Sequence, residues 1–213
     1  MRRRPLLLAA IATVLTALAP APEVEEGFVP LFDGKTTKGW EEIGEPGDWK
    51  VKDGNLVTLG KGGRWISTDR TYDNFVLRLE YRMGPGGNSG VNIRAPREGN
   101  PAYAGMEIQV LDDDHPMYKD LQPYQYTGSI YAVVAAKRGH TKPAGEWNAM
   151  EISADGPKVV VKLNGDTIVD ADLGAQPKAD KDHPGLKRKG GYIGLQSHTD
   201  PVEFRAIRIN ERK

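Results

Sequence analysis

The sequence contains no cysteine among its 213 residues. Disulfide bonds and thiolate metal sites are therefore excluded, and so is a lipid anchor attached to a cysteine. A chain of this length can bury enough apolar surface to fold without such cross-links. We therefore expect the fold to be held together by its core and its hydrogen bonds alone.

Neither sign of charge is in excess, because 29 Lys and Arg residues balance 29 Asp and Glu residues. The sequence thus lacks the basic footprint of a nucleic-acid-binding protein. It also lacks a run of about 20 apolar residues, the length needed to span a bilayer comfortably. Three further absences concern motifs: the sequence has no Gly-x-Ser-x-Gly elbow, no phosphate-binding loop and no His-Glu-x-x-His zinc motif.

The first residues, Met1-Arg-Arg-Arg, precede a short apolar run from Leu6 to Leu18, followed by small residues. This order is typical of a secretory signal. We expect a signal peptide over residues 1–19, a linker over 20–27 and one domain over 28–213, located in the periplasm or the medium. Removal of the signal leaves 26 basic against 29 acidic residues and no membrane attachment. The alternative is an uncleaved membrane anchor.

Apolar and polar residues alternate in most of the remaining chain, which is the period of a half-buried β-strand. In 75–83, for example, five apolar side chains share one face. Asn164-Gly165 and Asp53-Gly54 each separate two such runs and predict tight hairpin turns. No segment offers an amphipathic crossover helix, so a parallel α/β fold is disfavoured. Further strands are expected at 89–94, 106–111, 127–131, 147–153, 191–197 and 202–209, and a surface loop at 176–189. The fold class predicted is all-β, a two-sheet antiparallel jelly-roll sandwich.

Strand alternation also predicts which side chains share the outward face of a sheet. The polar members of four strands form a set without lysine: Asn92, Arg94, Glu107, Gln109, Tyr131, Gln196 and His198. Amides, a carboxylate, a guanidinium and an aromatic ring suit the hydroxyl groups of a sugar. The alternative is a merely solvated sheet face. Four tryptophans are expected mainly in the core, Trp147 among them, and His183 in a loop without a role.

Residues 107–112 have the form Glu-x-Gln-x-x-Asp. Simple alternation places Asp112 on the face opposite Glu107, and a β-bulge near Leu111 would return it to the same face. Glucanases of the laminarinase type carry a similar strand with two catalytic carboxylates. Here Gln109 stands where those enzymes have an aspartate, which argues against double-displacement chemistry.

The chain resembles the 3-keto-disaccharide hydrolase domain family, formerly a domain of unknown function that is common in environmental and gut bacteria. The resemblance rests on stretches that occur in the family's order: 28–40 (FVPLFDGKTTKGW), 87–95 (GNSGVNIRA), 105–112 (GMEIQVLD), 127–131 (TGSIY), 145–148 (GEWN), 191–198 (GYIGLQSH) and 202–209 (VEFRAIRI). It implies a concanavalin A-like lectin/glucanase fold, export, and action on carbohydrate.

The resemblance also implies a reaction in which a ketone at C3 acidifies the proton on C2 of a glucosyl unit. A base removes that proton, the group on C1 leaves, and water adds afterwards. The expected base is Glu107 or His198, with Arg94 stabilising the enolate and Tyr131 acting as acid or platform. The expected substrate-binding residues are Asn92, Gln109, Gln196 and Asp112. The sequence requires no cofactor, although a divalent metal in place of Arg94 is an alternative, with Glu107, Asp112 and His198 as candidate ligands.

Two other functions fit the same outward face. A non-catalytic carbohydrate-binding module needs the same groups for hydroxyl recognition, and a conventional glycosidase acts on unoxidised sugars. The partner expected in each case is a carbohydrate, with no nucleic acid and no oligomeric state implied.

Overall fold

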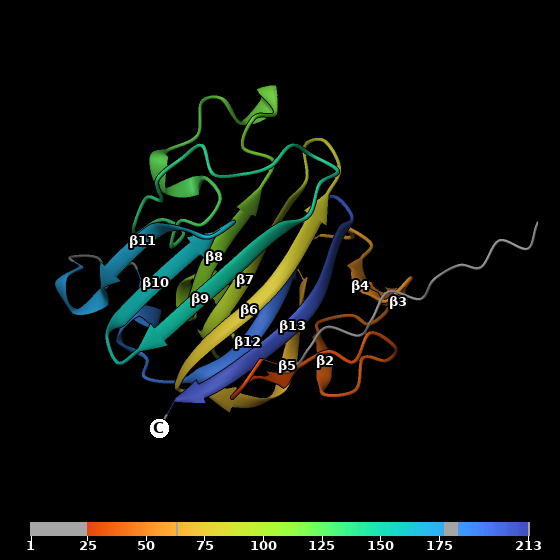
Figure 1. Cartoon of the computed structure of the whole chain (residues 1–213), viewed down its shortest axis with the longest axis horizontal. Helices are drawn as coiled ribbons and strands as arrows, with labels where there is room; N and C mark the ends of the chain where they lie inside the picture. Colours follow the sequence, from red (N-terminus) through yellow and green to blue (C-terminus); the bar gives the residue numbers. More distant parts are fainter. Residues whose placement is uncertain (1–24, 63, 177–182, 213) are drawn as a thin grey trace, which may run out of the picture.

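The computed structural model describes residues 25–62, 64–176 and 183–212 of the chain. The predicted signal peptide and most of the predicted linker therefore lie outside the described residues. The described part consists of antiparallel strands in two facing sheets (Figure 1), and the predicted all-β sandwich is confirmed. No helix among these residues is long and apolar enough to cross a membrane.

The larger sheet has the strand order β11-β10-β9-β6-β13-β4-β3, and β1 pairs with β13. Its strands are β1 (Val29–Pro30), β3 (Trp49–Lys52), β4 (Asn55–Thr58), β6 (Asn74–Met83), β9 (Asn148–Asp155), β10 (Lys158–Leu163), β11 (Asp166–Asp172) and β13 (Val202–Arg212). Asn164 and Gly165 both have positive φ in the β10–β11 turn, as do Asp53 and Gly54 between β3 and β4. Both predicted hairpins are therefore confirmed.

The smaller sheet has the order β2-β5-β12-β7-β8 and lies behind the larger one in Figure 1. Its strands are β2 (Trp40–Ile43), β5 (Arg64–Tyr72), β7 (Asn88–Ala95), β8 (Met106–Leu111) and β12 (Gly191–Ser197). Strands β2 and β5 have no counterpart among the strands expected from sequence. In β5 the run Ser67-Thr-Asp-Arg-Thr71 breaks the apolar alternation that marks a strand.

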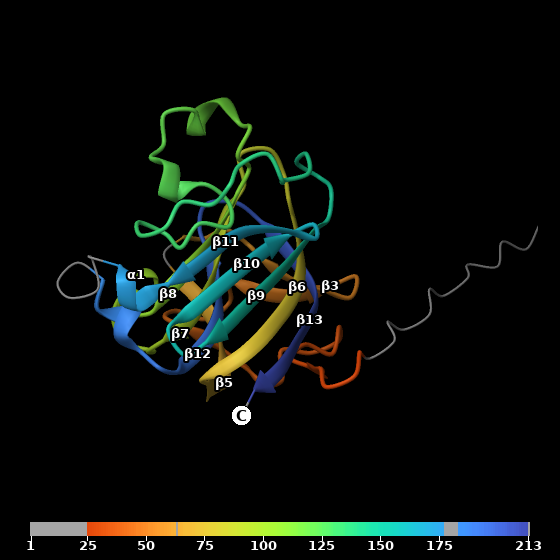
Figure 2. The ribbon, with the colours of Figure 1, turned by 60° about the vertical axis from the view of Figure 1, so that its left-hand side comes forward.

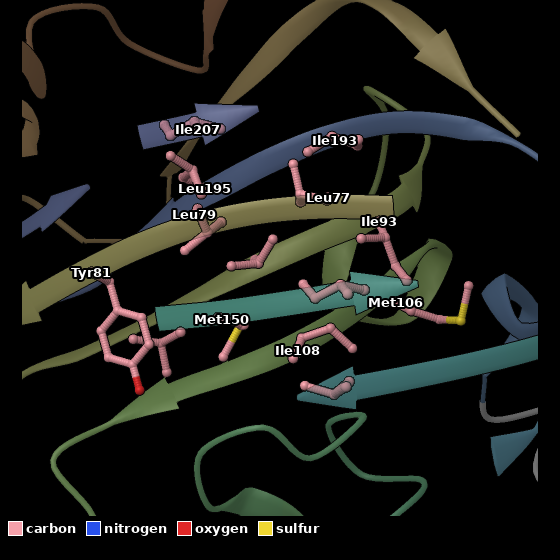
Figure 3. Packing of buried hydrophobic residues seen from close by; sticks show 14 of the residues in the cluster. Leu77, Leu79, Tyr81, Ile93, Met106, Ile108, Met150, Ile193, Leu195 and Ile207 are labelled. Carbon is pink, nitrogen blue, oxygen red and sulfur yellow. The ribbon is translucent and has the colours of Figure 1, made fainter. Parts of the chain in front are cut away.

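The core fills the space between the two sheets. Figure 3 shows Leu77 and Leu79 of β6 and Met150 of β9 close to Ile108 of β8 and Leu195 of β12. All five side chains are at most 2% exposed. Because these residues point inward, the alternate residues of β7, β8 and β12 point to the outer face of the smaller sheet.

Short helices and loops cover one end and one edge of the sandwich. The helices are α1 (Pro101–Ala104), η1 (Pro116–Tyr118), η2 (Pro123–Gln125), η3 (Leu173–Ala175) and η4 (Pro184–Lys187). The segment that carries η1 and η2 projects above the strands in Figure 2. The strand predicted at 127–131 is an isolated bridge at Ile130 rather than a full strand.

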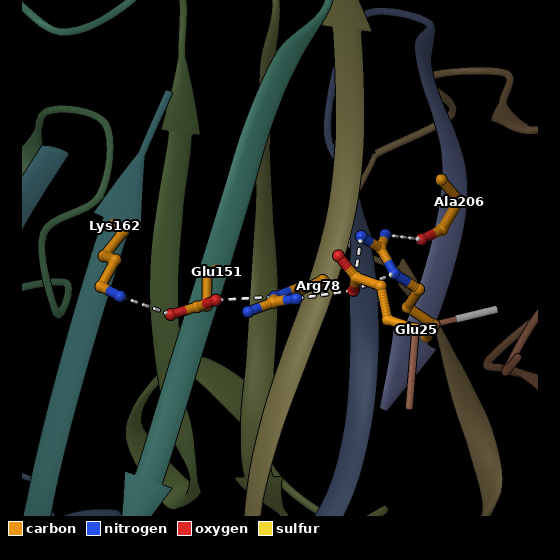
Figure 4. Close-up of polar contacts among 6 residues, drawn as sticks. Glu25, Arg78, Glu151, Lys162 and Ala206 are labelled. Carbon is orange, nitrogen blue, oxygen red and sulfur yellow. Dashed lines mark hydrogen bonds and ion pairs between the residues drawn. The ribbon is translucent and has the colours of Figure 1, made fainter. Parts of the chain in front are cut away.

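The start of the described chain is fixed to the outer face of the larger sheet. Glu25 accepts hydrogen bonds from Arg78 at 2.6 Å and Arg208 at 3.2 Å. Arg78 also pairs with Glu151, which pairs with Lys162, so a row of alternating charges crosses three strands (Figure 4). Glu25, which falls within the predicted linker, thus belongs to the folded surface.

Two predictions about loops and tryptophans are wrong. Trp147 does not pack inside, because the guanidinium groups of Arg82 and Arg205 lie over its ring, 4.7 and 3.9 Å from the ring centroid. The predicted surface loop at 176–189 includes η4, in which Leu186 is buried, and His183 immediately before η4 is buried as well. Residues 177–182 of that loop lie outside the described residues.

Candidate active site

A cavity of about 220 Å³ opens on the outer face of the smaller sheet. It is bounded by strands β7, β8 and β12, by helix α1 and by the residues that follow η2. Amide and phenol groups dominate its lining, which consists of Asn88, Asn100, Ala102, Tyr103, Glu107, Gln109, Tyr131, Gln196 and His198. Five of these nine residues were predicted from sequence to share this face.

Glu107 is the buried carboxylate of the cavity, with only 3% of its surface exposed. It belongs to β8, and its side chain lies over Gly90 of the neighbouring strand β7. A Cβ atom at Gly90 would stand 2.4 Å from Oε1 of Glu107 and 2.6 Å from its Cγ. Glycine at this position therefore makes the space that the carboxylate occupies.

Burial raises the pKa of Glu107 to about 8. A carboxylate removed from water is destabilised unless a cation compensates it. Among the cavity residues that the structure describes there is no Lys or Arg. The carboxyl oxygen Oε2 instead accepts a hydrogen bond from Nε2 of Gln196 at 3.2 Å. Glu107 can therefore exchange a proton near neutral pH, as a general base requires.

Backbone pairing along the free edge of β8 brings Tyr131 to the cavity. The amide of Gln109 donates to the carbonyl of Ser129, and the amide of Tyr131 donates to the carbonyl of Glu107. The phenol oxygen of Tyr131 then accepts a hydrogen bond from Nε2 of Gln125 at 3.1 Å. This hydrogen bond holds the phenol oxygen of Tyr131, which lines the cavity, in place.

Tyr103 enters the cavity from α1, a segment for which the sequence predicted no role. Asn100 caps this helix by accepting the amide of Ala102, and Pro101 occupies the first helical position. The ring of Tyr103 meets that of Tyr131 edge to face at 6.2 Å and that of His183 at 5.0 Å. His183 in turn bonds through Nε2 to the carbonyl oxygen of Tyr131 at 3.1 Å.

Gln196 and His198 reach the cavity from β12 and from the residue that follows it. The ring of His198 is half-buried, and its Nδ1 bonds to the hydroxyl of Thr199 at 3.2 Å. One ring nitrogen of His198 is thus engaged outside the cavity, and this contact helps to hold the ring in place. His198 is therefore a second candidate base.

The side chain of Asn92 points to the outer face of the smaller sheet, but it is completely buried there. It pairs across β7 and β8 with Glu107, it is 0% exposed, and it does not line the cavity. Neither polar atom of its side-chain amide has a hydrogen-bond partner among the described residues. The predicted direct contact between Asn92 and substrate is therefore not available in this conformation.

Arg94 does not share the wall with Glu107, so its predicted placement is wrong. Between Asn92 and Ala95, β7 carries one residue more than the facing part of β12, and Arg94 has a φ of 49°. This bulge turns the side chain away, because an extra residue reverses the alternation. The guanidinium donates to the carbonyls of Asp73, Gly156 and Arg188. It borders a separate cavity of about 590 Å³ that has no buried carboxylate in its lining.

Asp112 is also outside the site. The β7–β8 register runs without a shift to Leu111, so the bulge that would bring Asp112 to the Glu107 face does not occur. The Asp112 carboxylate instead accepts the backbone amide of Gly86 at 2.8 Å. No group of three or more His, Asp or Glu side chains close enough to hold a metal ion occurs among the described residues. The candidate ligands Glu107, Asp112 and His198 are thus not brought together.

The structure adds four lining residues to those expected from sequence: Asn88, Asn100, Ala102 and Tyr103. Asn88 has the same strand parity as Gly90 and Asn92, so extending the alternation of β7 by two residues would have found it. Asn100-Pro101 is a helix-start signal, but a single turn of helix gives no indication of what it faces.

Comparison with known proteins identifies the family. The model of the family described as "3-keto-alpha-glucoside-1,2-lyase-like domain" matches residues 27–210. A protein of Bacteroides thetaiotaomicron named 3-keto-disaccharide hydrolase is 30% identical, over 88% of this chain and 79% of that protein.

Solved structures agree with this assignment. A candidate glycosyl hydrolase from Parabacteroides distasonis is 27% identical, with a TM-score of 0.75 over 88% of this chain and 95% of that one. A second from the same organism is 29% identical, with a TM-score of 0.73 over 87% and 99% of the two chains. A family GH16 endo-β-1,3(4)-glucanase is 13% identical, with a TM-score of 0.54 over 90% and 94%, and shares the fold alone. The predicted lectin/glucanase-type jelly roll is confirmed.

Proposed function

This chain belongs to the 3-keto-α-glucoside-1,2-lyase-like family, and we propose that it is a carbohydrate-cleaving enzyme that acts on 3-keto-glycosides by elimination. One observation carries the proposal: Glu107 is the single carboxylate in the lining of the cavity that the structure describes. A conventional glycosidase needs two carboxyl groups flanking the scissile bond. Removal of an acidified C–H proton needs one base.

In this reaction Glu107 takes the proton from C2, next to the C3 ketone. The electron pair moves to the ketone oxygen as an enolate. It then returns to form a C1=C2 double bond while the C1–O bond breaks. Water afterwards adds across that double bond, which restores the proton at C2 and places a hydroxyl on C1. The sum of both steps is hydrolysis, in line with the name of the Bacteroides relative.

The other cavity residues supply the groups that such a reaction needs. The enolate oxygen needs hydrogen-bond donors, and with Arg94 elsewhere these are the amides of Asn88, Asn100, Gln109 and Gln196. The leaving oxygen needs a proton, and the phenol of Tyr131, held in the cavity lining by Gln125, is the group that supplies it. His198 is the alternative base.

The test is an assay on a matched pair of disaccharides, one with a 3-keto glucosyl unit and one without. We expect cleavage of the keto sugar alone, and loss of at least about 1,000-fold in kcat for Glu107→Gln because a catalytic base is removed. Equal cleavage of both sugars would establish a conventional glycosidase. Binding of the keto sugar without turnover would establish a carbohydrate-binding module.

We also propose that the enzyme is exported to the periplasm or the medium, on the basis of the basic and apolar order of residues 1–19. Fractionation of expressing cells tests this. Removal of residues 2–18 is expected to retain the protein in the cytoplasm, and export of the shortened chain would contradict the proposal.

A further inference from the structure

The cavity around Glu107 is small for a disaccharide. Its volume of about 220 Å³ lies below the roughly 300–1,000 Å³ of sites that enclose drug-sized ligands. Glu107, which must reach the C2 proton, is almost fully buried in it. The ring that carries the ketone must therefore enter the cavity to reach Glu107, and the volume leaves a second ring to extend over the rim.

Tyr103 is the aromatic residue at that rim. It lines the same cavity as Glu107, yet 38% of its surface is exposed. Among the described residues, two other large apolar side chains are comparably exposed, Val29 and Met117, and neither lines this cavity. An exposed aromatic ring at the mouth of a polar cavity has no role in the core and has apolar surface left to bury.

The surroundings of Tyr103 hold its ring in place. His183, 1% exposed, packs at 5.0 Å from it, and Tyr131 meets it edge to face. His183 is also bonded to the backbone of Tyr131. The ring of Tyr103 and the proposed acid, Tyr131, are thus held in fixed positions relative to one another. A side chain that is already held in its binding orientation loses little conformational entropy when a ligand packs on it.

We propose that Tyr103 forms the leaving-group subsite, on which the ring attached through C1 packs while the 3-keto ring occupies the cavity. The substrates would be 3-keto-glycosides whose leaving group is itself a ring, either a second sugar or an aromatic aglycone. This inference rests on the proposed function. It adds a specificity-determining residue that interacts with the group that departs rather than with the ring that reacts.

Two substrates with the same 3-keto-glucosyl unit separate the subsites: a disaccharide and the methyl glycoside. Tyr103→Ala is expected to lower kcat/KM for the disaccharide about tenfold, chiefly through KM, and for the methyl glycoside less than about threefold. Tyr103→Phe keeps the ring and is expected to stay within about threefold of wild type on both. Tyr192→Ala, which removes a tyrosine packed on Arg97 outside the cavity, serves as the control for a lost aromatic ring.

Equal losses on both substrates with Tyr103→Ala would overturn the inference, because the ring would then contact the keto unit. Unchanged kinetics on both would overturn it as well. Melting curves of each variant show whether the fold is retained, and Tyr103→Phe tests the hydroxyl independently if Tyr103→Ala does not fold. If the wild-type enzyme cleaves neither keto sugar, the proposed function fails rather than the subsite.

Discussion

Gln196 donates a hydrogen bond to Glu107 across a strand that separates them. The two residues belong to β12 and β8, and β7 lies between these strands. The contact forms because β7 has Gly90 beneath the carboxylate, where a Cβ atom would collide with it. A glycine in one strand and an amide in another thus jointly position the proposed base.

Gly90→Ala is expected to displace Glu107 and lower kcat/KM at least about 100-fold, because small misplacements of catalytic groups are costly. The control is Gly84→Ala, since a Cβ atom at Gly84 meets nothing within 4 Å. Steady-state kinetics on a 3-keto-glycoside measure both variants. Near wild-type activity of a folded Gly90→Ala protein would show that the position of Glu107 does not matter.

The pH dependence of kcat/KM should follow the ionisation of Glu107. Because burial raises its pKa to about 8, activity is expected to rise with pH and level off above a midpoint near that value. Gln196→Leu removes a donor to the charged form and should move the midpoint up by about one unit. A midpoint that Gln196→Leu leaves in place would instead contradict Glu107 as the base and favour the alternative, His198.

The raised pKa of Glu107 also has a cost in stability. A carboxyl that binds its proton more tightly in the folded state favours folding below pH 4.5, and this contribution is lost as pH rises to about 8. Glu107→Gln has no such proton. The variant should therefore gain stability relative to wild type between pH 5 and 8, by at most on the order of 4 kcal/mol. Urea unfolding at several pH values measures this, and a constant difference would contradict the burial of the carboxylate.

Arg94 is expected to matter for stability rather than for chemistry. Its guanidinium donates to three backbone carbonyls, so Arg94→Met leaves those carbonyls without this donor and should cost about 2–4 kcal/mol. The values of kcat and KM for the folded protein should stay within about threefold of wild type. A stable variant with a collapsed kcat would restore the catalytic role expected from sequence.

The observed positions of Glu107 and Arg94 show what strand alternation alone can predict. Where the register is regular, as in β8 up to Leu111, the parity of Glu107 and Gln109 follows from the apolar residues between them. One extra residue in β7 directs the side chain of Arg94 away from the face that carries Glu107. A bulge leaves no distinct trace in an apolar–polar pattern, so parity arguments end where the first one occurs.

The positions of Tyr103 and His183 could not be predicted from the sequence, for a second reason. Both lie in short segments that connect strands, and both reach the site by packing of covering loops rather than by strand register. A single helical turn has too few residues for a periodic pattern. Asn92 shows a third limit: its direction follows from alternation, but its complete burial depends on what covers the sheet.

The proposed reaction depends on removal of the C2 proton by Glu107. The most direct test follows a 3-keto-glycoside labelled with deuterium at C2. We expect the wild-type enzyme to slow measurably on the labelled substrate and to release the label to water, and Glu107→Gln to do neither. Cleavage that retains all the deuterium at C2 would contradict it.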